Sequence, residues 1–244
     1  MNSNPLTPLA LGVVLGCAVL PCRAGAEAEP DASDKSPVVE WSTTYASRYA
    51  FQGFDYSEGR PVLQPSTSVS LRGFTAGLWG NVNQTRQELD ELDVTLERDF
   101  ERGRLSGSLG YAYLDYPHRE DWAPTHEAIL DLAFAAPLAA SLSMHWDAAA
   151  GAGRYWTFGL AREFESARGT FALTAKLFAQ EHYYGMTGFP ACETGAAFAG
   201  AWGAIAIEPA VARTWAWANG DFRDALAIEP HWMGSISVSS AWAR

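Results

Sequence analysis

Apolar and polar residues alternate along most of this chain after residue 40. In the segment LDVTLE at 92–97 every second residue is apolar, and the segments 142–147 and 170–177 follow the same pattern. Side chains point alternately to the two faces of a β-strand, so each segment has one apolar face and one polar face. Such strands form either a soluble β-sandwich or a barrel with lipid outside and a polar interior. We therefore expect an all-β fold.

Segments with this alternation recur along the chain, separated by turn residues such as Gly and Pro. The expected strands are 39–52, 61–72, 73–83, 89–101, 104–116, 126–136, 138–148, 154–165, 169–180, 194–204, 205–218 and 229–243. Most have the roughly 10 residues that a tilted strand needs to cross a bilayer. The sequence therefore predicts a transmembrane antiparallel up-and-down β-barrel of about 12 strands, an even number that is typical of bacterial barrels. In this assignment the short turns near 72–73, 102–103 and 168–169 do not all lie at the same end of the barrel.

The N-terminal segment has the pattern of a secretory leader. An apolar run at 6–20 precedes the small residues Ala24-Gly25-Ala26, which predicts cleavage after Ala26. An uncleaved anchor is disfavoured, because a spanning helix needs about 20 apolar residues and this run is shorter; a lipoprotein box at 14–17 is a second alternative. We expect a signal peptide at 1–26, a flexible lead-in at 27–37 and a barrel at 38–244, located in the bacterial outer membrane.

Composition narrows the class of protein further. The chain carries 28 acidic and 17 basic residues, a formal net charge of −11 at pH 7, and this sign disfavours nucleic-acid binding. Many of its 10 Trp residues lie near the ends of expected strands, where indole rings favour a membrane interface. Removal of the leader would leave Cys192 as the single cysteine, so no intrachain disulfide is expected. These observations favour a membrane barrel over a soluble β-sandwich.

Several local strings carry a family resemblance. Residues 45–54 read as a tyrosine-rich strand that runs into an aromatic-x-Gly turn, and 59–64 read Gly-x-Pro-x-x-Gln; the further strings are AGLWGN at 76–81 and those at 88–93 and 111–117. Together they resemble the TorF-type porin family of proteobacterial outer-membrane barrels, best over residues 40–117. The resemblance implies an outer-membrane β-barrel that acts as a porin. Two features depart from the family pattern: Gln52 stands where a basic residue is usual, and the chain ends in Trp242-Ala243-Arg244 rather than on an aromatic residue.

If the apolar strand faces meet lipid, the polar faces line the lumen. The residues expected there are Arg48, Gln52, Glu91, Asp93, Glu97, Asp99, Asp131, His145, Asp147, Glu163 and Lys176. Arg48 and Gln52 belong to the first expected strand, and the four acids from Glu91 to Asp99 belong to the fourth. Acids in a column at spacing two raise the cation concentration in a narrow passage. The predicted function is a porin-like channel for passive diffusion of small polar or cationic solutes; the alternative is a blocked lumen in which the acids pair with bases such as Arg48 and Lys176.

Other functions leave weaker signals in the chain. A lipid-hydrolysing barrel needs a Ser and a His on the lipid-facing rim, and no His lies in a compact His-x-Ser pattern. His145 and Asp147 share a strand face, and we expect them to be hydrogen-bond partners rather than a catalytic pair. A structural or adhesive barrel needs long ordered loops, and the longest gaps, 117–125 and 182–193, are modest.

We therefore expect a protein that is not an enzyme and needs no cofactor. No metal is expected either, since no cluster of His, Cys and Asp residues has the spacing of metal ligands. The expected partners are outer-membrane lipid, lipopolysaccharide and the barrel-assembly machinery.

Overall fold

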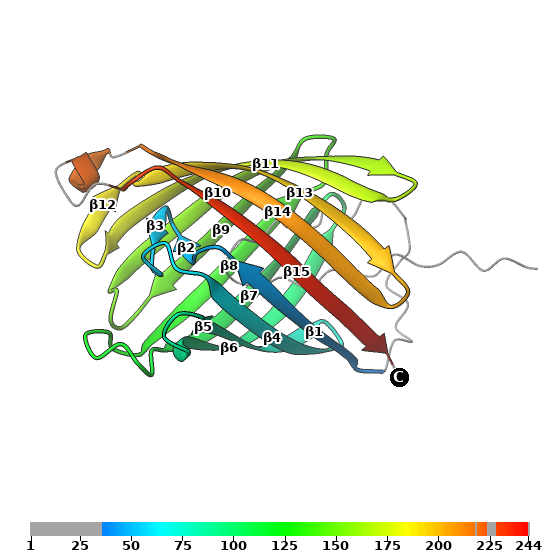
Figure 1. Cartoon of the computed structure of the whole chain (residues 1–244), viewed down its shortest axis with the longest axis horizontal. Helices are drawn as coiled ribbons and strands as arrows, with labels where there is room; N and C mark the ends of the chain where they lie inside the picture. Colours follow the sequence, from blue (N-terminus) through cyan, green and yellow to red (C-terminus); the bar gives the residue numbers. More distant parts are fainter. Residues whose placement is uncertain (1–35, 218, 224–227, 244) are drawn as a thin grey trace, which may run out of the picture.

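The computed structural model describes residues 36–217, 219–223 and 228–243. The predicted signal peptide and nearly all of the expected lead-in lie outside these residues. The described chain forms a closed antiparallel β-barrel (Figure 1). Within this part of the protein, no helix has the length and apolar character needed to cross a membrane.

Twelve strands make up the barrel wall. They are β1 (Val38–Ala46), β4 (Val62–Leu71), β5 (Phe74–Asn83), β6 (Glu88–Arg102), β7 (Leu105–Asp115), β8 (Thr125–Phe134), β9 (Ala139–Asp147), β10 (Gly153–Ser166), β11 (Gly169–Tyr183), β13 (Ala191–Trp202), β14 (Ile205–Ala216) and β15 (His231–Ala243). Each wall strand pairs with the next along the chain, and β1 pairs with β15, which closes the barrel. The short elements are β2 (Ala50–Phe51), β3 (Phe54–Asp55), β12 (Met186–Gly188) and the 3-10 helix η1 (Gly220–Arg223). The predicted fold class is confirmed.

The two ends of the barrel differ in their connections. The short turns lie at the end where β1 begins and β15 finishes, which we call the turn end; they are 72–73, 103–104, 135–138, 167–168 and 203–204. At 72–73 both residues are left-handed (φ 53° and 73°), as a type I′ hairpin turn requires. The opposite end, the loop end, carries the long connections, among them 47–61 and 116–124. The expectation that short turns fall at both ends is wrong, because in sequential hairpins every second connection returns to the same end.

Large apolar side chains cover the outer face of the wall. Leu96, Leu109 and Phe158 keep 53%, 57% and 45% of their surface exposed, although soluble proteins rarely expose extended apolar patches. The exposed Trp side chains near strand ends are Trp146, Trp215, Trp217 and Trp232 at the loop end and Trp202 and Trp242 at the turn end. This distribution is typical of a barrel surrounded by lipid, and it argues against a soluble β-sandwich.

The observed strand bounds differ from the expected ones mainly at the loop end. β1 ends at Ala46 rather than at residue 52, so the assignment of Arg48 and Gln52 to the first strand is wrong. The chain leaves the wall after Ala46, and Gln52 and Gly53 form the turn of the β2–β3 hairpin with φ of 52° and 89°. These left-handed values are incompatible with a continuous strand. The residues after β1 therefore have a different role from the wall.

Candidate functional site

Residues 47–61 connect β1 to β4 and fold back into the barrel at its loop end (Figure 1). We call this segment, which contains the β2–β3 hairpin, the plug. Gln52 Nε2 donates a hydrogen bond to Thr157 Oγ1 on β10 at 3.0 Å, and the ring of Phe51 meets Tyr155 of the same strand edge-on, with 5.2 Å between centroids. Because β10 lies on the opposite side of the sheet order from β1, the plug spans the lumen.

The plug fits closely against the wall at its tip. Gly53 has a φ of +89°, and a Cβ atom placed on it would lie 2.4 Å from the Cβ of Ala191 on β13. Aromatic rings of the plug pack against other parts of the loop end: Tyr49 on Trp79 of β5 (5.8 Å), Phe54 on Phe222 of η1 (6.0 Å) and Tyr56 on Trp122 (5.2 Å). The plug is therefore held from several sides of the barrel.

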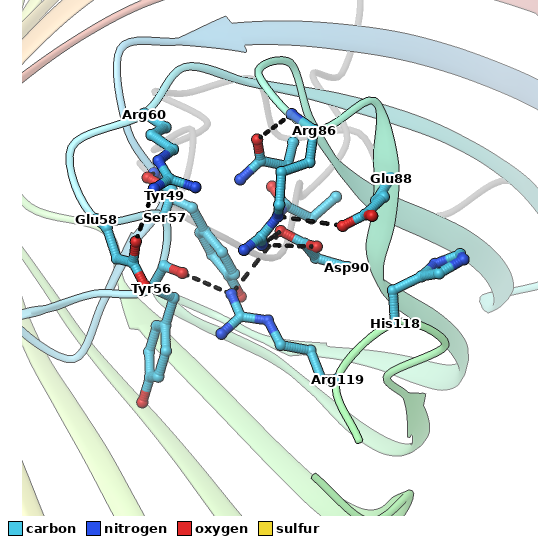
Figure 2. A network of polar contacts seen from close by, with 12 residues as sticks. Tyr49, Tyr56, Ser57, Glu58, Arg60, Arg86, Glu88, Asp90, His118 and Arg119 are labelled. Carbon is cyan, nitrogen blue, oxygen red and sulfur yellow. Dashed lines mark hydrogen bonds and ion pairs between the residues drawn. The ribbon is translucent and has the colours of Figure 1, made fainter. Parts of the chain in front are cut away.

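Charged side chains tie the plug to the loop end (Figure 2). Arg119, in the connection between β7 and β8, donates from Nη2 to the backbone carbonyl of Tyr56 at 2.5 Å and lies 3.8 Å from the Asp90 carboxylate on β6. Arg86 contacts both oxygens of the same carboxylate at 3.1 Å. Asp90 is only 2% exposed, so this buried acid is compensated by two guanidinium groups, one of which holds the plug.

The two bases that the sequence assigned to the lumen pair with acids outside the predicted set. Arg48 Nη1 lies 2.7 Å from Asp55 Oδ2, within the plug. Lys176 Nζ on β11 lies 3.0 Å from Glu193 Oε1 on the neighbouring strand β13. Both pairs thus cross short distances inside the barrel rather than reaching the acidic column of β6.

The four acids of β6 become more exposed from the loop end to the turn end. Glu91 and Asp93 are 7% and 5% exposed, Glu97 is half-buried and Asp99 is exposed. Tyr49 of the plug forms a hydrogen bond with Glu91, which places the plug over the buried end of the column. In the described part of the chain, no base forms an ion pair with any of the four. The column is therefore a row of carboxyl groups that no described ion pair compensates.

A second polar cluster joins β8, β9 and β10 in the loop-end half. Glu127 Oε2 accepts a hydrogen bond from the Tyr155 hydroxyl at 3.0 Å and lies 2.8 Å from His145 Nδ1. Asp147 instead accepts a hydrogen bond from the Thr125 hydroxyl at 2.6 Å. The expectation that His145 and Asp147 are mutual partners is therefore wrong: the two side chains share the inward face of β9 but reach different neighbours on β8.

Two residues of the site, Glu127 and Arg119, were not predicted from the sequence, for different reasons. Glu127 lies on the same face of β8 as Asp131, so strand alternation alone could have identified it. Arg119 lies in a loop, where no periodicity operates, and nothing in the sequence signals its contact with the plug. The described residues contain no group of three His, Cys, Asp or Glu side chains that could hold a metal ion.

Towards the turn end, the inward-facing side chains are small or only partly buried. Asp131 on β8 and Glu163 on β10 are both half-buried. From the middle of the wall to the turn end, small inward-facing side chains that keep partial or full exposure are Ser106, Ser141, Ser143, Ser237 and Ser239. The interior of the barrel is thus packed in the loop-end half and accessible in the turn-end half.

Burial and nearby acids raise the pKa of two tyrosines in the loop-end connections, Tyr49 and Tyr184. Burial raises the pKa of Tyr49 well above its usual value, and the charges of Glu91 and Asp93 raise it further. The pKa of Tyr184 is raised to about 12, first by burial and then by the acids Asp147, Glu127 and Glu91. Both hydroxyls therefore stay protonated at neutral pH, and the Tyr49 hydroxyl donates a hydrogen bond to Glu91.

The comparisons with known proteins support the fold. No family model and no curated protein matches the chain. Among solved structures, the chain is similar to the NanC porin, with a TM-score of 0.56 and 12% identity over 83% of this chain and 98% of that one. A second similar structure is an outer membrane channel from Pseudomonas putida F1, with a TM-score of 0.48 and 8% identity over 88% of this chain and 100% of that one. The likeness to NanC shows that the chain has the fold of a porin barrel.

Proposed function

We propose that the protein is a porin-like channel of the bacterial outer membrane, through which small polar or cationic solutes diffuse passively. The porin fold supports the channel role. The observation that carries the solute class is the column of carboxyl groups from Glu91 to Asp99, none of which forms an ion pair with a described base. The apolar outer face and the Trp side chains near both strand ends support a membrane location.

The column gives this channel a simple electrostatic mechanism. A solute that enters at the turn end meets the exposed Asp99 and then Glu97, about 7 Å further along the strand. Carboxylates in a confined passage with low-dielectric walls raise the local concentration of cations and lower that of anions. Further in, the plug lies over Glu91 and Asp93, so the loop-end half limits the size of a solute that passes.

The proposed function also includes a route of export and membership of a porin family. We propose cleavage after Ala26, assembly by the barrel-assembly machinery, and contact with outer-membrane lipid and lipopolysaccharide. We also propose membership of the TorF-type porin family, on the strings at 45–54 and 59–64. Gln52 departs from the basic residue usual in that family, and in this chain it joins the plug to β10.

The lipid-hydrolase alternative gains no support from the outward-facing histidine at the loop end. His126 Nδ1 lies 2.5 Å from the Tyr111 hydroxyl, and its ring packs beside Tyr113 with 5.2 Å between centroids. Both neighbours are tyrosines, whereas the hydrolase chemistry requires a serine nucleophile within hydrogen-bond reach. A plugged structural barrel is the stronger alternative, because the plug spans the lumen.

Single-channel recording in a planar bilayer with a salt gradient tests the proposal. We expect discrete current steps and a cation-biased reversal potential. The double variant Glu97→Gln, Asp99→Asn should lose most of this bias, whereas Glu120→Gln, which removes an exposed acid of the β7–β8 loop, should keep it. An anion bias, or no current from either the wild type or a variant without the plug, would exclude the channel proposed here.

A further inference from the structure

Three arginines on the outer surface of the turn end share one arrangement. Each guanidinium lies over a phenylalanine ring: Arg98 over Phe74 at 4.7 Å, Arg104 over Phe134 at 5.0 Å and Arg162 over Phe164 at 5.5 Å, from the guanidinium carbon to the ring centroid. All six side chains are exposed. We call this set the Arg–Phe girdle. The rings present apolar surface to the surroundings, and each carries a fixed positive charge at its edge.

The short turns fix the orientation of these guanidinium groups. Arg98 Nη1 donates to the backbone carbonyl of Arg72, and the absence of a side chain at Gly73 leaves the space that the Arg98 guanidinium occupies. Arg104 Nε donates to the carbonyl of Ala135 at 2.8 Å, and Arg162 Nη1 donates to the carbonyl of Pro137 at 3.1 Å. A guanidinium has five N–H donors, so one such bond holds the group in place and leaves most of its donors for a ligand.

Arg104 and Arg162 approach the same turn from its two sides. The turn at 135–138 joins β8 to β9; Arg104 follows β6 and reaches it across β7, and Arg162 reaches it from β10. The turn and the adjoining end of β8 carry two exposed apolar side chains, Phe134, over which Arg104 lies, and Leu138, at 46% and 54% exposure. Two cations that flank an apolar surface match a ligand with an anionic head and an apolar body.

At the turn end, basic residues of β6 lie on the outer face of the wall and acidic residues lie on the inner face. Along β6, Arg98 lies on the outward row with Leu96 and Phe100, whereas Asp99 lies on the inward row with Glu97. None of the three girdle arginines forms an ion pair with a carboxylate in the described part of the chain. Their charge is therefore available to a partner outside the barrel.

We propose that the Arg–Phe girdle binds the phosphate of anionic phospholipid headgroups in the leaflet at the turn end, with Arg104 and Arg162 forming a site around the turn at 135–138. This inference rests on the membrane location in the proposed function, and it goes beyond the transport role. A guanidinium matches a phosphate geometrically with paired N–H donors. The adjacent Phe134 and Leu138 contact the glycerol and upper acyl chains, as aromatic and apolar residues do at membrane interfaces.

Native mass spectrometry of the purified protein with added lipid tests this site. We expect phosphatidylglycerol to be retained several-fold more than phosphatidylcholine with the same acyl chains. The double variant Arg104→Gln, Arg162→Gln should lose retention of phosphatidylglycerol by at least about fivefold, the effect of roughly one basic residue near an anionic surface. Its retention of phosphatidylcholine should not change.

The matched control is Arg213→Gln, which removes an outward-facing arginine that is also stacked on aromatic rings, Trp215 and Trp232, but lies at the loop end. This variant should retain phosphatidylglycerol like the wild type, and excess inorganic phosphate should not displace the lipid. Equal retention of the two lipids by the wild type, displacement by free phosphate, or an unchanged double variant would overturn the inference. Because the double variant should still conduct with a cation bias, loss of lipid preference alone leaves the channel proposal intact, whereas loss of conduction alone leaves the lipid site intact.

Discussion

The two halves of this barrel share one wall but differ in their interior. In the loop-end half, the plug, the tyrosines and the acids fill the lumen, and Glu127 is only 2% exposed. In the turn-end half, the inward-facing residues are small or carboxylate-bearing, and Asp99 on β6 is exposed. Since the same strands run through both halves, the difference lies in their inward-facing side chains and in the segment at 47–61, which leaves the wall after β1 and fills the loop-end half.

The two halves also differ in whether their acidic residues have ion-pair partners. Several acids of the loop-end half have specific partners, such as Asp90 with Arg86 and Arg119; Asp93 is an exception, since it is only 5% exposed and forms no ion pair with a described base. Acids nearer the turn end form no described ion pair along β6. Buried charges need partners because desolvation is costly, whereas exposed charges keep their water. One half is thus organised as a packed core and the other as a solvated passage.

Removal of the plug should have the largest effect on the difference in packing between the two halves. Ala46 and Val62 already pair across β1 and β4, so a two-residue Asn-Gly hairpin can replace residues 47–61 without altering the wall. We expect the single-channel conductance to rise several-fold, because the loop-end half loses its filling. Planar-bilayer recording measures it. An unchanged conductance would show that other residues set the narrowest point.

A smaller change at the plug tip should loosen the plug without deleting it. Gly53→Ala places a Cβ 2.4 Å from that of Ala191 and also forces alanine into a left-handed conformation at φ +89°. Gly59→Ala is the matched control, since Gly59 also has a positive φ of +72° but nothing lies within 4 Å of its Cβ position. The backbone strain of about 1 kcal/mol is common to both, so the clash is the difference.

We expect Gly53→Ala to make the aromatic residues of the plug more sensitive to chymotrypsin than Gly59→Ala does. The barrel itself should remain folded, as judged by its heat-modifiable migration on a gel. Equal cleavage of the two variants would mean that the contact with β13 does not hold the plug in place.

A single strand allows the two halves to be compared by stability. Glu127 and Asp131 lie on the same face of β8, but Glu127 is buried with two hydrogen-bond partners, and Asp131 is half-buried nearer the turn end. Glu127→Ala leaves His145 and Tyr155 without their shared acceptor and should lower the free energy of unfolding by about 2 kcal/mol. Asp131→Asn should change it by less than about 0.5 kcal/mol. Urea unfolding in detergent measures both, and similar effects would argue against a packed loop-end half.

The wall of the barrel could be predicted from the sequence because neighbouring residues along the chain determine each strand. Alternation at period two, as in the segment 92–97, fixes both the strand and the face that each side chain occupies, and the observed strands follow the expected ones closely. The same rule would have identified Glu127, which shares its row with Asp131. Pairing of strands that follow one another then determines the closed barrel.

The interior could not be predicted in the same way, because long-range contacts determine it. The residues from 47 to 52 continue the expected first strand in composition, yet they turn inward to reach Tyr155 and Thr157 on β10. One of the two partners of Asp90 is Arg119, which lies in a loop without periodicity. The bases Arg48 and Lys176 likewise find partners that sequence spacing does not indicate.

The most direct test of the two-halves account compares the reactivity of cysteines along the acidic column of β6. Asp99→Cys and Asp93→Cys, each in a Cys192→Ser background, place a thiol on the same inward row in the two halves. With a small cationic methanethiosulfonate reagent, the thiol at 99 should react at least about tenfold faster than the thiol at 93, since tenfold corresponds to only about 1.4 kcal/mol of protection by burial. Removal of residues 47–61 should abolish the difference. Equal rates in the intact protein would contradict the account, because they would show that the plug does not close the loop-end half.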